Sequence, residues 1–502
     1  MAERTINFES GEQLVDHECS LTGIVLNEPS SQIYPLLHAG MDAQNHRGEE
    51  AAGIAWVYGG RVRVTKDLGL RQAALPDRAF LDMSESAVAI GHTRYSTAGN
   101  PDVKNAQPFL FNDGQFALAH NGNVHWEIPP AAGEPTSDTY GVGKMIASGP
   151  GSTIQNTIAT LGDLNGAYAF IFVTPDGLFA ARDPWGFRPL IYGQLGNGIM
   201  GSVVTSESVG SHDTHASNLK NIPRGTLVKI EPDGFNIVWE DSRIAEIPEA
   251  ACSFEHAYFS DAASRVNVER SEQTNHELRV FLGRSLHNTA RPVGEMVVAV
   301  PNSGRSYAEG VALQSGLPLL QAIQTNRHAG RNFIKPSTPE ERKRAAHNKY
   351  RFIPELINNR DLIIVDDSLV RGSTAAGIIL SLFEHGANHI ELLLGTPPIT
   401  HPCYWGIDFQ DPLTLIYNQL IKNGDQESFE LKLAEWLVAG DKQLLGRLRV
   451  SFQKLDNYKS IIQGIGKTVP IEHSGGCYHC VSGIVPIGAL ADVNMAKHRF
   501  DH

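Results

Sequence analysis

The sequence predicts two domains of different fold class: a sheet-rich α+β domain, followed by an α/β domain with a parallel sheet. The chain has 502 residues, which is enough for two or three domains that each bury a full core. In the first half, short apolar runs alternate with turns rich in Gly, Asn, Asp and Pro, which is typical of strands. In the second half, long helical stretches alternate with short apolar strands, as in a parallel sheet covered by helices.

Four short runs carry the strand prediction for the first half: residues 87–90, 116–119, 167–173 and 227–230. Each is an apolar segment bounded by turn residues. The pattern changes near residues 248–254, where we place the domain boundary.

In the second half, strands are predicted at residues 296–300, 362–365 and 389–394, with a helix over residues 375–385. The last two strands flank this helix and form a βαβ unit, which belongs in a parallel sheet. Ligands of such sheets bind at the carboxyl ends of the strands. Residues 425–455 are amphipathic and charged, and we interpret them as helices that serve packing only.

Composition and charge exclude several classes of function. The chain is 41% apolar and 19% charged, as is ordinary for a globular protein. No apolar run approaches the ~20 residues of a membrane helix. The net charge of −13 disfavours non-specific binding to a phosphate backbone. We therefore expect neither a nucleic acid nor a membrane as partner, and an anionic substrate needs a local positive site.

Residues 1–18 do not have the layout of a secretion signal. They contain five acidic residues, one arginine and no apolar core. A frayed tail is the simpler interpretation, and a short leader that is cut off is the functional one. The chain has only five cysteines, too few and too scattered for a disulfide scaffold. A reduced, cytoplasmic setting is therefore predicted.

The most specific motif spans residues 362–374 and predicts a phosphate site. An apolar strand delivers two adjacent carboxylates, Asp366 and Asp367, to the edge of the sheet. A Gly/Ser/Thr turn then begins a helix, whose open N–H groups bind phosphate. The carboxylates suit ribose hydroxyls, or a Mg²⁺ that bridges a diphosphate. An acidic strand end with a helix cap would explain a lone Asp-Asp pair, but it explains the full pattern poorly.

This pattern resembles that of the phosphoribosyl-diphosphate-binding transferases, and the resemblance implies roles for further residues. Asp366, Asp367 and Ser303 match residues that serve Mg²⁺ and ribose, and Lys349 matches a residue that meets the diphosphate. The 5-phosphate is held by residues that match Arg371, Gly372, Ser373 and Thr374. Ser303 lies in a turn at residues 301–304, which is a weak signal when taken alone.

The first half resembles the N-terminal-nucleophile, or class II, glutamine amidotransferases. The resemblance rests on segments that follow the family order: residues 19–25, 46–50, 91–97, 120–123, 137–139 and 183–190. Taken alone, Asn121-Gly122 is better interpreted as a β-turn, and Arg94 as a surface ion pair. Only the complete set overturns these two interpretations.

This second resemblance implies a glutamine site around Cys19. A thiol attacks the side-chain amide, and the α-amine of the same residue, with an ordinary pKa of about 8, serves as the base. That amine exists only once residues 1–18 are removed, and leaders of this family cleave themselves. Asn121 and the Gly122 N–H match the oxyanion donors, while Arg94 and Asp138 match the residues that bind the α-carboxylate and α-amine of glutamine.

The other four cysteines, Cys252, Cys403, Cys477 and Cys480, suit a metal centre. The C-x-x-C of Cys477 and Cys480 could be redox-active, zinc-binding or accidental. Four thiolates suit zinc or an iron–sulfur cluster. The residues around Cys252 and Cys403 resemble ligand segments of the iron–sulfur-containing amidophosphoribosyltransferases. This resemblance implies a structural [4Fe–4S] cluster.

The chain departs from this family at several positions. Ser20 replaces the glycine that follows the nucleophile, and Asn302 replaces an aspartate of the diphosphate turn. In the loop over the phosphoribosyl site, His328 and the pair Tyr350-Arg351 are unusual. Residues 410–460 match poorly, as if they carried an insertion, and the segment between Asn123 and Ser137 looks shortened. We therefore predict a divergent member.

The predicted domains are a cleaved propeptide (residues 1–18), a class II glutamine amidotransferase sandwich (19–250), a type I phosphoribosyltransferase sheet (251–425) and a helical segment with cluster cysteines (426–502). The predicted reaction is the glutamine-dependent amination of 5-phosphoribosyl 1-diphosphate to 5-phosphoribosylamine, the first step of purine synthesis. The resemblance implies Mg²⁺, a homo-oligomer (tetramer or dimer) and purine nucleotides as inhibitors. Two alternatives stay open: a paralogue with another acceptor or sugar, and a non-catalytic regulatory homologue.

Overall fold

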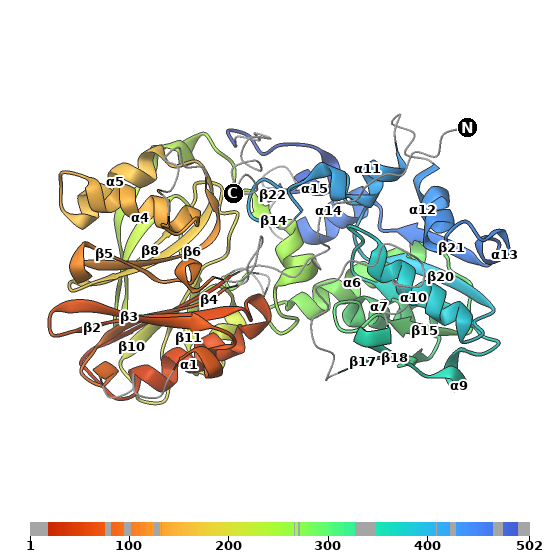
Figure 1. Ribbon diagram of the computed structural model, residues 1–502, viewed down its shortest axis with the longest axis horizontal. Helices are drawn as coiled ribbons and strands as arrows, with labels where there is room; N and C mark the ends of the chain where they lie inside the picture. Colours follow the sequence, from red (N-terminus) through yellow and green to blue (C-terminus); the bar gives the residue numbers. More distant parts are fainter. Residues whose placement is uncertain are drawn as a thin grey trace. The chain divides into compact units, whose positions relative to one another are not determined.

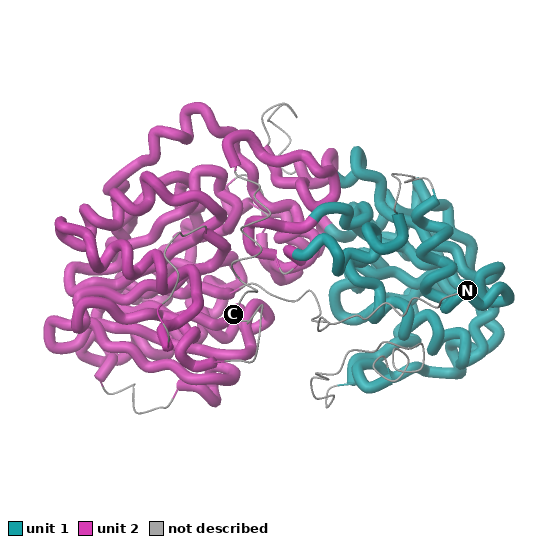
Figure 2. The backbone as a smooth tube through the Cα atoms, turned by 45° about the horizontal axis from the view of Figure 1, so that its top comes forward, with its two compact units in different colours: residues 1–16, 279–401, 411–458 teal, residues 17–278, 402–410, 459–502 magenta. Residues whose placement is uncertain are grey.

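The computed structural model describes residues 19–75, 82–94, 102–124, 131, 133–265, 267–269, 272–326, 347–407, 409–421, 428–464 and 475–489. The leader at residues 1–18 and the loop residue His328 lie outside this range. The chain forms two compact units (Figure 2). Of the described residues, unit 1 comprises those within 279–401 and 411–458, and unit 2 comprises those within 19–278, 402–410 and 459–489.

Unit 2 is built on two antiparallel sheets with the strand orders β11-β9-β10-β1-β4-β2-β3 and β13-β12-β8-β7-β6-β5. The strands of the seven-stranded sheet are β1 (Ser20–Leu26), β2 (Ala51–Tyr58), β3 (Arg61–Leu68), β4 (Val88–Arg94), β9 (Ile191–Gln194), β10 (Gly201–Thr205) and β11 (Ser217–Asn221). Those of the six-stranded sheet are β5 (Phe109–Phe111), β6 (Phe116–Val124), β7 (Gly166–Thr174), β8 (Gly177–Arg182), β12 (Thr226–Glu231) and β13 (Gly234–Glu240).

Small and branched side chains fill the space between the two sheets, among them Leu21, Ala119 and Ile171. Helices cover the outer faces (Figure 1). Helix α1 (Ile33–Ala43) packs on the seven-stranded sheet, whereas α4 (Asp138–Ser148) and α5 (Thr153–Asp163) pack on the six-stranded sheet. The result is a four-layered sandwich of helix, sheet, sheet and helix, which is the predicted architecture of the front half.

Unit 1 contains a five-stranded sheet of order β16-β15-β19-β20-β21, in which every pair of neighbours is parallel. Its strands are β15 (Met296–Ala299), β16 (Leu319–Leu320), β19 (Asp361–Asp366), β20 (His389–Leu394) and β21 (Leu448–Phe452). Its helices among the described residues are α7 (Arg305–Ser315), α9 (Pro354–Ile357), α10 (Ser373–Glu384), α11 (Ile416–Leu420), α12 (Phe429–Leu437) and α13 (Lys442–Leu445). Helices α6 (Asn275–Ala290) and α14 (Leu455–Gln463) each cross a limit between the units, at Arg279 and after Tyr458. A short hairpin of β17 (Ile323–Thr325) and β18 (Tyr350–Phe352) lies outside this sheet.

The structure confirms the predicted fold class, and the predicted strands of both halves are present. The interpretation of residues 425–455 was partly wrong. Helices α12 and α13 form there, but β21 follows them and pairs with β20. Its apolar residues Leu448, Val450 and Phe452 alternate with polar ones, a strand period that the surrounding helical pattern concealed.

Two segments late in the sequence belong to unit 2. They are residues 402–410 and the chain from residue 459 onward, as Figure 2 shows. Strand β22 (Gly476–Cys477) pairs with β14 (Ala251–Cys252), and helix α15 (His479–Ser482) follows β22. Among the described residues, unit 1 begins at Arg279, and the predicted domain limits at residues 250 and 425 stay predictions. Among the described residues, no helix is both long and apolar enough to cross a membrane.

Candidate active site

Cys19 directly precedes β1 and is partly exposed. Ser20, the next residue, lies opposite Thr93 on β4, and the two hydroxyl oxygens are 2.6 Å apart in a fully buried contact. The Ser20 side chain is therefore accommodated within the sheet. Arg47 also contacts Cys19, because its Nε donates to the Cys19 carbonyl oxygen at 3.3 Å.

Asn121 and Gly122 lie within strand β6, so the β-turn interpretation of this pair is wrong. The Asn121 side chain is buried, and among the described residues its Nδ2 has no hydrogen-bond partner. Gly122 has a φ of 147°, and a Cβ there would lie 2.0 Å from the Ala167 carbonyl oxygen. The close approach of β7 thus requires glycine at this position.

The two residues predicted to bind glutamine lie at the ends of their elements. Arg94 is the last residue of β4, and its Nη1 donates to the Asn105 carbonyl oxygen. Asp138 is the first residue of α4, and its Oδ2 accepts from the Val124 N–H at 3.1 Å. Asp138 therefore lies beside Val124, the last residue of β6, and Val124 is two residues after Gly122.

Two histidines that the sequence prediction did not name join the sheets at this place. His92 lies opposite Leu21 in the β4–β1 ladder, and its Nε2 is 3.2 Å from the His120 carbonyl oxygen on β6. Burial, with the charge of Arg94 nearby, lowers the pKa of His92 to about 3. A neutral imidazole can donate this bond, so it brings the start of β1 close to Asn121. Both histidines lie within the family-like segments at residues 91–97 and 120–123, but no local pattern in the sequence signals that they join the two sheets.

The cysteine-bearing segment also packs on β6. The Asn123 Nδ2 donates to the Tyr404 carbonyl oxygen at 2.9 Å. A Cβ on Gly406 would lie 2.5 Å from Arg188 Nη2 and 3.1 Å from the Gly122 carbonyl carbon. This part of unit 2 therefore covers the strand that carries the predicted oxyanion donors.

In unit 1, the predicted phosphate-site residues gather at the carboxyl end of the parallel sheet. Asp366 ends β19, and Asp367 follows it in a buried position. The turn that contains Ser303 lies against this end, since a Cβ on Gly304 would be 3.1 Å from the Asp366 Cα. Burial and the neighbouring Asp367 carboxylate raise the pKa of Asp366 well above its ordinary value, while Lys349 opposes this shift. The positive charge of Lys349 therefore acts on Asp366.

The Gly/Ser/Thr turn begins a helix, as predicted. Gly372 caps α10 with a φ of 81°, and Ser373 is the first helical residue, with Thr374 after it and Arg371 before the cap. A Cβ on Gly372 would lie 2.9 Å from the Trp436 ring, so the turn is tightly packed. Two further residues interact electrostatically with this site: burial and the carboxylates of Asp366 and Asp367 raise the pKa of the buried Tyr307 hydroxyl, and Arg279 opposes this shift. Sequence reasoning did not identify these two.

The four remaining cysteines come together in unit 2. Cys252 and Cys477 are register partners in the β14–β22 pair. Burial, with a smaller contribution from the Cys403 thiol, raises the pKa of the Cys252 thiol to about 12. The pKa of Cys480 is raised well above its usual value by burial and by the other three thiols. All four are therefore close enough to interact electrostatically.

Four thiols form a donor set that suits zinc or an iron–sulfur cluster. Among the described residues, no three His, Cys, Asp or Glu side chains converge on one point as a single metal ion requires. A zinc ion holds its sulfurs at about 2.3 Å, whereas a cluster inserts its own irons and sulfides between the thiolates and so spaces them more widely. Buried thiols with raised pKa values also need a positive centre before they can act as thiolates.

The two units thus combine an N-terminal-nucleophile glutamine amidotransferase sandwich with a phosphoribosyltransferase sheet. A family model described as a glutamine amidotransferase domain matches residues 92–208. The chain is similar to the amidophosphoribosyltransferase of Mycobacterium leprae, with 32% identity over 97% of this chain and 84% of the relative. It is 30% identical to the Bacillus subtilis amidophosphoribosyltransferase over 95% of this chain and 96% of that protein.

A solved structure agrees. The glutamine phosphoribosylpyrophosphate amidotransferase of B. subtilis, complexed with ADP and GMP, superposes with a TM-score of 0.77 and 28% identity, covering 94% of this chain and 98% of that one. The chain belongs to the amidophosphoribosyltransferase family. This assignment confirms the predicted activity, the glutamine-dependent amination of 5-phosphoribosyl 1-diphosphate to 5-phosphoribosylamine at the start of purine synthesis.

Proposed function

We propose that Cys19 is the nucleophile of glutamine hydrolysis and that its own α-amine, freed by removal of residues 1–18, is the base. The thiol proton passes to the amine as Sγ attacks the amide carbon of glutamine. The same proton then goes to the leaving nitrogen, so ammonia departs and a thioester forms. Water hydrolyses the thioester to glutamate and regenerates the thiol.

Asn121 is the observation that carries this proposal. Its buried Nδ2 lacks a partner among the described residues, and the His92–His120 contact joins its strand to the one that follows Cys19. A buried donor left unpaired costs free energy, and an oxyanion that forms only in the tetrahedral state would satisfy it. Arg94 and Asp138 would bind the α-carboxylate and α-amine of the substrate.

In unit 1, the proposed acceptor site is the carboxyl end of the parallel sheet. Asp366, Asp367 and Ser303 would hold Mg²⁺, which supplies charge neutralisation for the diphosphate leaving group. Lys349 would contact the same diphosphate, and residues 371–374 would hold the 5-phosphate at the start of α10. Ammonia attacks C1 of the ribose, the C1–O bond to diphosphate breaks, and the nitrogen loses one proton.

We further propose that Cys252, Cys403, Cys477 and Cys480 hold a structural [4Fe–4S] cluster. The pairing of Cys252 with Cys477 and the mutual influence of the four thiols support it. A reducing, cytoplasmic setting follows from this part of the proposal, because the ligands must remain reduced. The departures at Ser20, Asn302, Tyr350 and Arg351 support a divergent branch.

Two further properties are proposed from family membership. One is a homo-oligomeric state, tetramer or dimer. The other is inhibition by purine nucleotides, which is supported by the solved B. subtilis relative with its bound ADP and GMP.

The test is glutamate release from glutamine by anaerobically purified protein with Mg²⁺, with and without 5-phosphoribosyl 1-diphosphate. Strong stimulation, matched by release of diphosphate, is the expected result. Glutamate release that ignores the sugar phosphate would favour another acceptor. No release from protein whose intact mass shows Cys19 exposed would favour the non-catalytic alternative.

A further inference from the structure

Arg47 lies in a buried cluster of charges next to the proposed nucleophile. It belongs to the short helix η1 (Asn45–Arg47), and its side chain has no exposed surface. The side chains of Glu207 and Glu255 are 3% and 2% exposed. Ions at such depth are costly unless they are paired and fully hydrogen-bonded, so this group is held by its contacts.

Both carboxylates bind the guanidinium of Arg47. Its Nη1 donates to Glu207 Oε1 and to Glu255 Oε2, each at 3.1 Å, and its Nη2 donates to Glu255 Oε1 at 2.9 Å. Its remaining nitrogen, Nε, donates to the Cys19 carbonyl oxygen. Because the guanidinium is planar, fixing its outer nitrogens also fixes the direction of Nε. We call Glu207 and Glu255 the carboxylate clamp.

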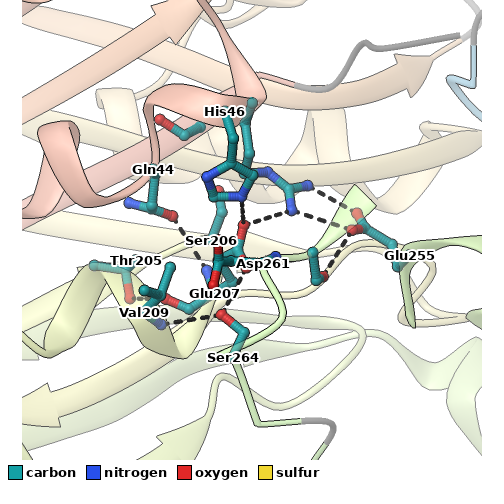
Figure 3. A network of polar contacts seen from close by, with 12 residues as sticks. Gln44, His46, Thr205, Ser206, Glu207, Val209, Glu255, Asp261 and Ser264 are labelled. Carbon is teal, nitrogen blue, oxygen red and sulfur yellow. Dashed lines mark hydrogen bonds and ion pairs between the residues drawn. The ribbon is translucent and has the colours of Figure 1, made fainter. Parts of the chain in front are cut away.

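Each carboxylate of the clamp is itself held in place. Glu207 Oε2 accepts from the Asp261 N–H at 2.7 Å and from the Ser264 hydroxyl at 2.6 Å, and Glu207 Oε1 lies 2.6 Å from His46 Nε2. Figure 3 shows Glu207 between His46 and Ser264, with Glu255 reaching the network from another segment. Interaction with His46 and Arg47 keeps the pKa of Glu207 far below its usual value despite burial.

Glu255 has its own supports. Ser260 Oγ donates to Glu255 Oε2 at 3.2 Å, and Arg188 Nη1 donates to Oε1 at 3.4 Å. The Arg188 side chain is 1% exposed, and its Nη2 donates to the Trp405 carbonyl oxygen at 2.6 Å. The clamp therefore draws on three separate stretches of chain to hold one side chain at Cys19.

The clamp is tied to β1 by a second route. Gln44 Oε1 accepts from the Glu207 N–H at 3.2 Å, and Gln44 Nε2 donates to the Leu21 carbonyl oxygen at 3.2 Å. Two sets of contacts therefore fix Arg47 relative to the first residues of β1. One is made by the Arg47 side chain, and the other by the nearby Gln44.

We propose that Glu207 and Glu255 are positioning residues of glutamine hydrolysis, which act through Arg47 on the carbonyl group of Cys19. This inference rests on the proposed role of Cys19. Holding that carbonyl restricts rotation about the Cys19 backbone, and so aims both the thiol and the α-amine at the substrate amide. The two negative charges also offset the cation beside this amine.

The effect of the two negative charges on the α-amine can be measured as a change in the pH dependence of the rate. A purely structural role of the two glutamates would not change this pH dependence. The charged groups around Cys19 in this network are Arg47, Arg188, Glu207, Glu255 and, when protonated, His46. Replacing one carboxylate with its isosteric amide leaves the group more positive by one charge. A more positive surrounding favours the neutral amine, so the pKa of the α-amine falls, and the acidic limb of the rate profile moves to lower pH.

The experiment measures kcat and KM for glutamine against pH in wild type, Glu207→Gln and Glu255→Gln. The control is Asp241→Asn, which disrupts another ion pair of unit 2, that of the buried Asp241 with the partly exposed Arg243. We expect each clamp variant to lower kcat by about tenfold or more, to change KM less, and to shift the acidic limb down by about half to one pH unit. The control is expected to keep the wild-type limb.

Iron content and thermal unfolding are measured on the same samples, because Glu255 lies three residues after Cys252. Folded, iron-replete variants with an unshifted limb and wild-type kcat would overturn the inference. A limb that shifts equally in Asp241→Asn would also overturn it. If one clamp variant does not fold, the kcat and the acidic limb of the other variant test the inference. A wild-type protein that releases no glutamate would instead refute the proposed function, so the two failures are distinguishable.

Discussion

Cys252 and Cys477 lie directly opposite each other in the parallel β14–β22 pair, although they come from distant parts of the sequence. The same region of unit 2 includes residues 402–410, whose Tyr404 carbonyl oxygen accepts from Asn123 at the end of β6. The proposed cluster site is therefore built into the amidotransferase unit, and its segments cover the strand of Asn121 and Gly122.

Replacing Cys477 with serine is expected to remove most of the bound iron and sulfide. A hydroxyl ligates iron poorly, and burial raises the pKa of the Cys252 and Cys480 thiols, which disfavours their thiolate forms without the cluster. Iron, sulfide and visible absorbance of anaerobically purified protein check this. Cys19→Ser is the matched control, and it should keep its iron while losing glutaminase activity. Full iron in Cys477→Ser would contradict the ligand assignment.

Asn121→Ala is expected to lower kcat for glutamate release by about 10²–10³-fold, with little change in KM. An oxyanion donor acts mainly in the transition state, so substrate binding is largely spared. Steady-state glutamate release checks this. A change confined to KM would place Asn121 in substrate binding instead.

Gly122→Ala is expected to destabilise unit 2 by roughly 2–4 kcal/mol, from the unfavourable φ and the contact with β7. The added Cβ would lie 2.0 Å from the Ala167 carbonyl oxygen. Gly162→Ala on α5 is the control, because a Cβ there meets no described atom within 4 Å. Thermal unfolding should show a drop of several degrees for the first variant only.

Features of this fold that depend on residues adjacent in sequence could be predicted, whereas features that depend on distant residues could not. The strand–turn–helix of residues 362–374 was predictable because the two aspartates and the Gly/Ser/Thr turn are adjacent in sequence, and local propensity dictates their structure. The strands near residues 87–90 and 167–173 were found for the same reason. The Asn121-Gly122 pair could be assigned only through its surrounding motifs, because its local preference favours a turn, whereas sheet pairing with β7 places it in a strand.

Long-range features were not predictable. Glu207 and Glu255 carry no local sign that they meet at Arg47, since the contact depends on how three segments pack. Strand β21 is defined by its pairing with β20 rather than by its own composition. The return of residues 402–410 to unit 2 likewise arises from tertiary contacts.

Lys349→Met is expected to raise KM for 5-phosphoribosyl 1-diphosphate about tenfold or more. The ammonium lies near Asp366, and loss of a charge-assisted contact to the diphosphate costs roughly 1.5–3 kcal/mol. Initial rates of diphosphate release over a range of substrate concentrations check this. Lys442→Met on α13, an exposed position, is the control and should match wild type. An unchanged KM would remove Lys349 from the site.

His92→Asn is expected to make the stability of unit 2 less sensitive to acid. Burial lowers the pKa of His92 to about 3, against 6.5 when it is exposed. Between these values the unfolded chain binds a proton that the folded chain refuses, so the free energy of unfolding falls as pH falls. The limit is about 1.4 kcal/mol per pH unit.

The wild-type melting temperature should therefore drop relative to that of His92→Asn between pH 6.5 and pH 5, by several degrees. His212→Asn, at an exposed position, is the control and should follow wild type through the same range. Parallel curves for wild type and His92→Asn would mean that the imidazole accepts its proton in the folded state. The contact between His92 Nε2 and the His120 carbonyl oxygen would then survive in a charged form, and His92 would add no pH dependence to the stability of unit 2 in this range.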